Sequence, residues 1–165
     1  MIQAVLSRII ALVAKAQELA LTIGIPNILQ PGLIKEMVIA QKLDHDLIFS
    51  KRDADACDRD NPEIKYEYLS CLEGGTGQID RMFKEPPSKR RQSLKRITRN
   101  RMIYFAIFYK TNPLKLKVIY EVKPDIVLRE TETKLDRSSN PISHVGFGER
   151  WVRQNGTVVF RDEDA

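Results

Sequence analysis

The sequence has few of the residues that build disulfide scaffolds or zinc-binding modules. It contains two cysteines, Cys57 and Cys71, and two histidines among 165 residues. The cysteines lack CxxC spacing and are too few for a four-ligand structural zinc site, so we expect reduced thiols packed in the core. His45 and His144 stand alone in the sequence, and neither is assigned a catalytic role.

The sequence also lacks an uninterrupted apolar run of the length that crosses a membrane. Its most apolar stretch, residues 4–25, is interrupted by Arg8, Lys15 and Glu18, which makes it a poor membrane span or signal-peptide core. We therefore expect a cytoplasmic protein with no membrane partner. There is no internal repeat, low-complexity tract or long linker, and the length suits one domain with one core.

Positive charge is concentrated in one segment. Of 27 basic and 22 acidic residues, nine bases and one acid, Glu85, lie between Arg81 and Arg101, so the remainder of the chain carries an excess of acid. The nine bases are Arg81, Lys84, Lys89, Arg90, Arg91, Lys95, Arg96, Arg99 and Arg101. A focused basic patch favours a polyanion such as nucleic acid as partner. The alternative is a solvated helix face.

Hydrophobic periodicity in the first half of the chain predicts two helices and three strands. The spacing of Ala, Leu and Ile predicts a mostly buried helix over residues 2–22, and a second helix is expected over 31–43. Short β-like runs at 46–51, 63–71 and 77–84 predict three antiparallel strands in sequence, because turn residues separate them.

The second half predicts a basic helix over 88–100, with Ser88 as N-cap, followed by strands at 102–109 and 116–122. The first of these strands is apolar throughout, which predicts a place in mid-sheet. A helix is expected around 130–136, and Asn155-Gly156 predicts a hairpin turn within 151–160. The order of elements indicates an α/β fold, a central mixed sheet flanked by helices.

Six carboxylates gather in a short segment. They are Asp53, Asp55, Asp58, Asp60, Glu63 and Glu67. Residues two apart on a strand share a face, so Glu63, Lys65 and Glu67 should project together, next to the carboxylates of the preceding strand. Clustered carboxylates resist burial unless they share a cation, and their oxygens are natural ligands of Mg²⁺. A divalent metal beside Lys65 suits phosphodiester hydrolysis.

The pattern resembles the PD-(D/E)xK nuclease superfamily, which includes most type II restriction endonucleases. In that family an acidic residue on a helix precedes a hairpin with one Asp, then an acidic residue, any residue and Lys. The matching residues are Glu36, Asp55 and Glu63-Ile64-Lys65. The resemblance implies a restriction-endonuclease-like sandwich in which Asp55, Glu63 and Glu67 bind one or two Mg²⁺ ions, while Glu36 and Lys65 complete the catalytic set.

Other assignments of the motif remain open. The same three-residue pattern recurs at 121–123 and 132–134, and Pro124-Asp125 supplies a literal PD. We favour the first copy because it alone lies on an acidic hairpin downstream of a helical Glu. If Glu67 is the central acid, Leu69 takes the lysine position and Lys65 would reach in from the other side. The resemblance implies a single domain over 1–165, with N-terminal helices at 1–45, a catalytic core at 46–123 and an extension at 124–165.

The activity implied is Mg²⁺-dependent cleavage of double-stranded DNA by a sequence-specific type II enzyme. Cutting both strands of a palindrome requires two centres, so a homodimer is expected. Alternatives are a structure-selective nuclease like a Holliday junction resolvase and a non-catalytic nucleic-acid-binding module. Basic and amide side chains meet phosphates and base edges. The expected DNA contacts are Gln78, Arg81, Lys89, Arg90, Arg91, Ser93, Lys95, Arg96, Arg99, Asn100 and Arg101.

Overall fold

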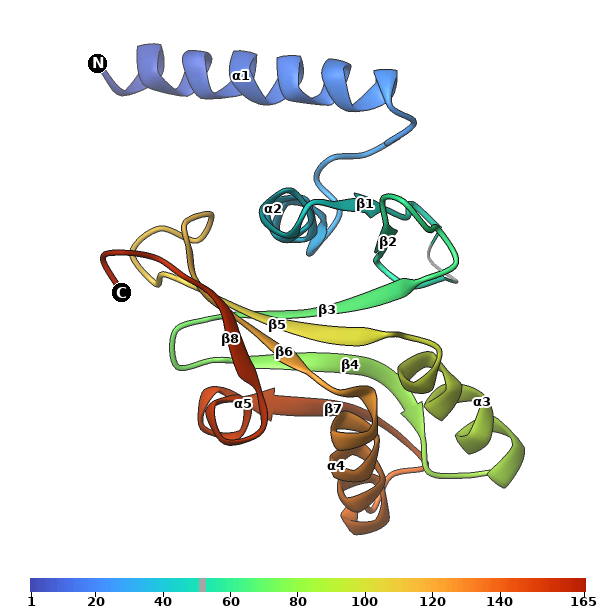
Figure 1. The fold of residues 1–165 in the computed structure, drawn as a ribbon. Helices are drawn as coiled ribbons and strands as arrows, with labels where there is room; N and C mark the ends of the chain where they lie inside the picture. Colours follow the sequence, from blue (N-terminus) through green and yellow to red (C-terminus); the bar gives the residue numbers. More distant parts are fainter. Residues whose placement is uncertain (51–52) are drawn as a thin grey trace. The chain divides into compact units, whose positions relative to one another are not determined.

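The computed structural model describes residues 1–50 and 53–165. Lys51, the last residue of the strand predicted over 46–51, and Arg52 after it lie outside the described residues. The chain forms two compact units, residues 1–34 and 35–165 (Figure 1). None of the helices in the described ranges combines the length and the apolar character that a membrane crossing requires.

The first unit contains α1 (Ile2–Thr22), the segment after it and the start of α2 (Leu33–Leu43). The predicted bounds of α1 are confirmed, but its predicted burial is wrong, because Ala20 is its buried residue and the other positions are half-exposed or exposed. Gln17 joins the last turns to the following segment: its Nε2 donates to Pro26 O (3.2 Å), and its Oε1 accepts from the Ile28 N–H (2.9 Å).

The second unit is built on a mixed six-stranded sheet in the order β1-β2-β3-β5-β6-β8. Its strands are β1 (His45–Leu47), β2 (Ala56–Asp58), β3 (Lys65–Leu72), β5 (Met102–Phe108), β6 (Leu116–Val122) and β8 (Thr157–Arg161). β3 and β5 are parallel, and the other neighbours are antiparallel. The predicted α/β class with a mixed sheet is confirmed, as is the mid-sheet place of β5.

A second, two-stranded sheet pairs β4 (Thr76–Phe83) with β7 (Ile142–Gly148). The prediction of three successive antiparallel strands is therefore wrong, since β2 precedes β3 in the large sheet and β4 leaves it. The predicted hairpin at 151–160 is also wrong. Residues Glu149–Asn155 form helix α5, and β8 then crosses to pair with β6.

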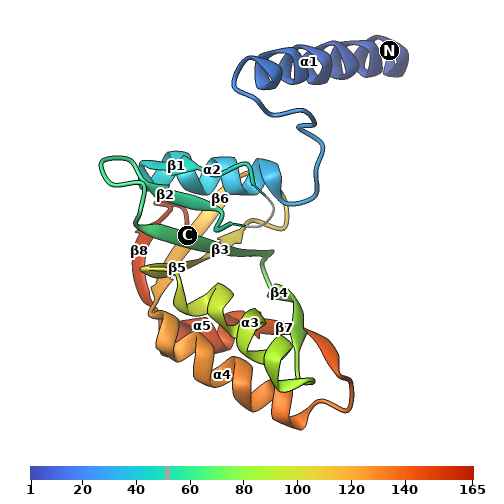
Figure 2. The same ribbon diagram turned by 90° about the vertical axis from the view of Figure 1, so that its right-hand side faces the viewer.

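The remaining helices lie on one side of the large sheet. Figures 1 and 2 show α3 (Pro87–Thr98), α4 (Pro124–Arg137), α5 and the small sheet on one side, with α2 on the other. α3 begins at Pro87, so Ser88 lies inside the helix and not at its N-cap as predicted. A proline suits the first turn because the N–H it lacks has no helical partner there.

Alternation along β3 sends its residues to two separate cores. Leu69 and Cys71 pack with the small sheet and α4, while Tyr66 and Tyr68 pack with α2 on the opposite face. By the same alternation Glu67 lies on the face of Leu69, toward the small sheet. Both cysteines are free and buried, as predicted.

Gly77 fixes how closely the small sheet approaches the large one. A Cβ at this position would lie 2.9 Å from Phe105 Cε2 and 3.1 Å from Leu69 Cβ. We predict that Gly77→Ala lowers the free energy of unfolding by about 1–3 kcal/mol, because overpacking displaces core atoms. Urea unfolding measures the loss. Gly146→Ala is the control, since its Cβ would meet atoms at 3.8 Å or beyond; equal losses in both variants would contradict this account.

Candidate active site

Glu67 is a buried carboxylate in the middle of the unit. Its side chain is 15% exposed, and Arg99 Nη2 lies 3.6 Å from its Oε2. Burial and the charge of Asp55 raise the pKa of Glu67 to about 8, although Arg99 and Arg96 oppose the shift. Oε2 makes no hydrogen bond within the described part of the chain. A buried carboxylate oxygen without a hydrogen bond is costly, which marks it as a candidate ligand atom.

Asp55 is the second buried carboxylate, and it comes directly before β2. Its backbone N–H donates to Tyr66 O (3.1 Å), and its Oδ2 accepts a hydrogen bond from the Tyr68 N–H (2.7 Å). Burial raises the pKa of Asp55, while the Tyr68 hydrogen bond and the charges of Arg99 and Arg96 lower it. The ties to β3 on both sides of Glu67 hold the two carboxylates in one site.

Glu36 adds a third carboxylate, from α2. Burial, followed by the negative charge of Asp55, raises the pKa of Glu36 to about 7. The sequence prediction of a helical acid near the hairpin thus corresponds to an electrostatic interaction between α2 and the segment before β2. The structure brings Glu36, Asp55 and Glu67 into mutual influence, with Asp55 at the centre.

Lys65 lies at the edge of this site. Its Nζ is 3.5 Å from Asp53 Oδ2. The hydrogen bond from the Ala54 N–H, together with Lys65 and Arg99, keeps the pKa of Asp53 below its usual value. Lys65 and Glu67 are two apart on β3 and share a face, whereas Leu69, the next residue on that face, is buried in the core.

Glu63 does not join the other carboxylates. It lies in the exposed turn before β3, where its backbone N–H donates to Asn61 Oδ1 (3.2 Å). The strand predicted from residue 63 begins at Lys65, so the predicted shared face of Glu63, Lys65 and Glu67 is reduced to its last two members. The reason is local: Asp58 and Asn61 side chains accept backbone N–H groups and close the turn before the strand starts.

The later copies of the three-residue pattern have other roles in the structure. Lys123 is the N-cap residue of α4, and Asp125 forms an exposed pair with Arg129 (3.2 Å). Lys134 Nζ donates to Gly146 O (2.6 Å), so this lysine joins α4 to β7. Asp125 and Lys134 are therefore engaged in structural contacts.

The donors of the acidic site are compatible with Mg²⁺. This ion keeps several waters and is commonly held by one or two carboxylates together with substrate phosphates. Asp55 and Glu67 supply two carboxylates, one of which has an oxygen that lacks a hydrogen bond. Within residues 1–50 and 53–165, no group of three histidine, cysteine or acidic side chains gathers as a metal cage. Asp55 and Glu67 therefore fit a Mg²⁺ site with two protein carboxylates, in which water and substrate supply the other ligands.

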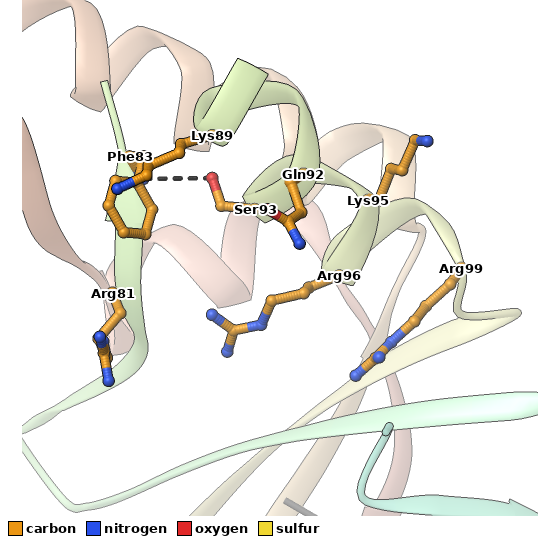
Figure 3. A pocket seen from close by; sticks show the side chains of 8 residues that line it. All are labelled: Arg81, Phe83, Lys89, Gln92, Ser93, Lys95, Arg96 and Arg99. Atoms are coloured by element: carbon orange, nitrogen blue, oxygen red, sulfur yellow. Dashed lines mark hydrogen bonds between the residues drawn. The ribbon is translucent and has the colours of Figure 1, made fainter. Parts of the chain in front are cut away.

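A basic pocket of 570 Å³ lies between β4 and α3. Five of its lining side chains are cationic, and its lining contains no acid among the described residues. The cations are Arg81, Lys89, Lys95, Arg96 and Arg99, joined by Phe83, Gln92 and Ser93. In Figure 3 the guanidinium groups of Arg96 and Arg99 reach from α3 and its end toward the side of the pocket that carries Arg81. This charge suits a phosphate-bearing ligand.

A bulge in β4 positions two of the arginines. The register with β7 shifts between Ile79 and Met82, and Arg81 has a φ of 53°. Such left-handed backbone is uncommon outside glycine and occurs where a bulge redirects a side chain. The carbonyl of Asp80, within the bulge, accepts a hydrogen bond from Arg96 Nη1 (2.8 Å). The bulge therefore aims Arg81 into the pocket and also holds Arg96.

Several predicted DNA contacts serve the fold instead. Asn100 is 5% exposed, and its Nδ2 donates to Arg96 O (2.7 Å) and Ile97 O (3.3 Å), so it caps the end of α3. Ser93 lines the pocket but is buried, with its Oγ accepting from the Phe83 N–H (3.2 Å). In this structure the Asn100 side chain is therefore held against the end of α3 and is not presented to solvent.

Other predicted contacts are not among the residues that line the pocket. Arg90 Nη1 pairs with Asp136 Oδ1 of α4 at 2.8 Å. Arg91 and Arg101 are exposed and are not lining residues, and Gln78 is an exposed residue on β4 opposite Gly146 of β7. Periodicity could not separate these side chains, because Leu94 and Ile97 fix only the buried face of α3.

Arg99 links the basic pocket to the acidic site. It lines the pocket, forms the ion pair with Glu67, and affects the pKa values of Asp53 and Asp55. Sequence reasoning missed this contact because Arg99 and Glu67 are far apart along the chain. It also missed Asp53 as the partner of Lys65, and Gln92 and Phe83 in the pocket lining, which no motif marks.

The raised carboxylate pKa values make the stability of the metal-free protein depend on pH. A group whose folded pKa exceeds its unfolded value stabilises below the unfolded pKa and loses that contribution as pH rises through the folded one. We predict that the urea midpoint of the protein in EDTA falls between about pH 5 and about pH 8. Glu67→Gln, which cannot ionise, should flatten this fall. Parallel profiles for both proteins would show that Glu67 titrates normally.

Comparison with models of known protein families gives no match, and comparison with curated proteins gives none either. The resemblance to PD-(D/E)xK nucleases therefore depends on the residues of this chain alone.

Proposed function

We propose that the chain is a Mg²⁺-dependent endonuclease that hydrolyses phosphodiester bonds of double-stranded DNA, with a restriction-endonuclease-like fold. One observation carries the proposal: the buried pair Asp55 and Glu67 borders, through Arg99, a pocket lined by five cationic side chains. A phosphodiester needs this combination, because cations bind its charge and carboxylates hold the divalent ion used in hydrolysis.

The buried carboxylates would hold the ion. Asp55 and Glu67 are the ligands we propose, with Glu36 close enough to influence Asp55 electrostatically. A bound Mg²⁺ would polarise the phosphate and increase the acidity of the attacking water. Deprotonated carboxylates are needed for this role, so pKa values near 7 and 8 in the metal-free site favour metal binding at neutral to alkaline pH.

Lys65 and Arg99 would have different roles. A lysine ammonium can orient water and exchange protons, whereas a guanidinium stays charged and can only bind or offset negative charge. Leu69 occupies the position of the family lysine relative to Glu67, so Lys65, held by Asp53, is the ammonium we assign to the reaction. Arg99 would orient Glu67 and offset charge on the phosphate.

We also propose that the enzyme is a sequence-specific type II endonuclease, and the cleavage products distinguish this from the alternatives. A sequence-specific type II enzyme would yield discrete fragments, whereas a structure-selective nuclease would act on branched DNA and leave a linear duplex largely uncut. Each chain supplies one such site, so cutting both strands at a palindrome requires two copies. Binding without cleavage under any metal condition would favour the non-catalytic binding module.

Incubation of the purified protein with plasmid DNA tests the activity. We expect cleavage in Mg²⁺ and none in EDTA. Glu67→Gln and Asp55→Asn should each lose at least about a hundredfold in rate, since an amide lacks the charge that holds the ion. Lys65→Ala should lose cleavage while keeping most of its DNA affinity.

Glu63→Gln is the matched control, because Glu63 lies in the exposed turn of the same segment. It should cut like the wild type. A second readout does not depend on turnover: Mg²⁺ at pH 8 should raise the urea midpoint of the wild type more than that of Glu67→Gln. Wild-type cleavage by Glu67→Gln with an unchanged Mg²⁺ requirement would remove this carboxylate from the site.

The salt dependence of DNA binding tests the basic pocket. Each phosphate contact contributes about −0.9 to the slope of log affinity against log salt. Lys95→Ala should flatten that slope by about one unit and weaken all sequences alike. Arg91→Ala removes a charge from the same helix outside the pocket lining and should change the slope much less. If the two variants behaved alike, DNA would not bind through the pocket.

A further inference from the structure

One face of α1 is an apolar stripe that the rest of the first unit leaves uncovered. Its members recur at alternating spacings of three and four residues, the pattern of a coiled-coil seam. They are Ile2, Val5, Ile9, Leu12, Ala16 and Leu19. The five large side chains are between 50% and 75% exposed. Large exposed apolar surfaces of this kind mark sites of association.

A second stripe with similar spacing is partly used within the first unit. It consists of Leu6, Val13 and Ala20, which lie beside the first stripe on the helix surface. Ala20 is 4% exposed and lies near the contacts that Gln17 makes with the following segment. The two large side chains of this second stripe, Leu6 and Val13, are 44% and 40% exposed. The first stripe is therefore the open one, and Leu6 and Val13 flank it.

We propose that this stripe joins two copies of the chain in a parallel, two-stranded coiled coil. In heptad terms Ile2, Ile9 and Ala16 take position a, and Val5, Leu12 and Leu19 take position d. β-Branched residues at a with leucine at d favour parallel dimers over trimers and tetramers. Three heptads make a short coil, so association is reversible and depends on concentration.

The charged residues of α1 favour the parallel orientation. Arg8 and Lys15 both take position g. In a parallel pair, position g faces position e of the other helix, so the alkyl stem of Arg8 would cover Val13 of the second copy, which is 40% exposed. In an antiparallel pair, position g faces position g, and Arg8 would meet Lys15 of the second copy. Like charges in contact oppose that arrangement.

The proposed dimer is independent of the proposed nuclease activity. It would bring two active centres into one particle, which double-strand cleavage at a palindrome needs. Its tests measure association alone, so a protein that failed to cut DNA could still dimerise, and a monomeric protein could still cut single strands.

Sedimentation equilibrium of the full chain tests the dimer over a roughly hundredfold range of concentration. We expect the wild type to shift from monomer toward dimer. Ile9→Asp should weaken the dimer at least about a hundredfold, because a charge is buried in the seam. Ile10→Asp is the matched control: the same residue type, adjacent in the helix, 67% exposed and off the stripe. It should dimerise within about threefold of the wild type.

Oxidation of variants with one added cysteine in α1 tests the orientation of the two helices. Leu19→Cys should cross-link, because position d faces its own counterpart in a parallel pair at a separation a disulfide can span. Leu21→Cys, exposed at 58% on another face, should not. A wild-type monomer throughout, equal effects of the two aspartates, a larger assembly, or cross-linking by Leu21→Cys alone would each overturn the proposal.

Discussion

The parallel pairing of β3 with β5 decides which side of the sheet each residue of the acidic segment faces. β5 is buried in mid-sheet, so its partner strand has little freedom of register, and a slip of one residue would exchange the two faces of β3. In the observed register Tyr66 and Tyr68 pack toward α2, and Glu67 lies on the face of Leu69 and Cys71. A carboxylate is thereby buried beside Arg99, and the raised pKa of Glu67 follows from that placement.

Several hydrogen bonds and positive charges offset part of the free-energy cost of burying these carboxylates. The Tyr68 N–H donates to Asp55, and Arg99 and Arg96 stabilise the charged forms of Asp55 and Glu67. These contacts do not cancel the cost of burial, since the pKa of Glu67 remains near 8. Strongly shifted carboxylates beside a basic pocket are typical of functional sites, where a bound cation or substrate supplies the missing compensation. The same imbalance makes the metal-free site less stable when its carboxylates ionise.

The small sheet and α3 determine where positive charge can act. The bulge at Asp80 and Arg81 holds Arg96 and turns Arg81 toward the pocket, while Asn100 ends α3 and leaves Arg99 next to Glu67. Of the basic segment, Arg90 is used to join α3 to α4. Some basic residues of the segment therefore line the pocket, whereas Arg90 stabilises the packing of α3 against α4. Dimerisation through α1 would concern the other compact unit and leave this division unchanged.

The sequence by itself determined the α/β class with a mixed sheet and the approximate bounds of α1, α3, β5 and β6. It also marked Glu36, Asp55, Glu67 and Lys65 as candidate site residues. These follow from periodicity, breakers and charge, which are local properties. Only the tertiary structure decided that Glu63 stays in a turn, that Leu69, two residues after Glu67, is buried in the core, and that β4 leaves the large sheet. It also decided that Arg99 meets Glu67 and that only Ala20 of α1 is buried by the segment that follows the helix. These depend on strand register and on contacts between distant segments, which the pattern of a single segment does not contain.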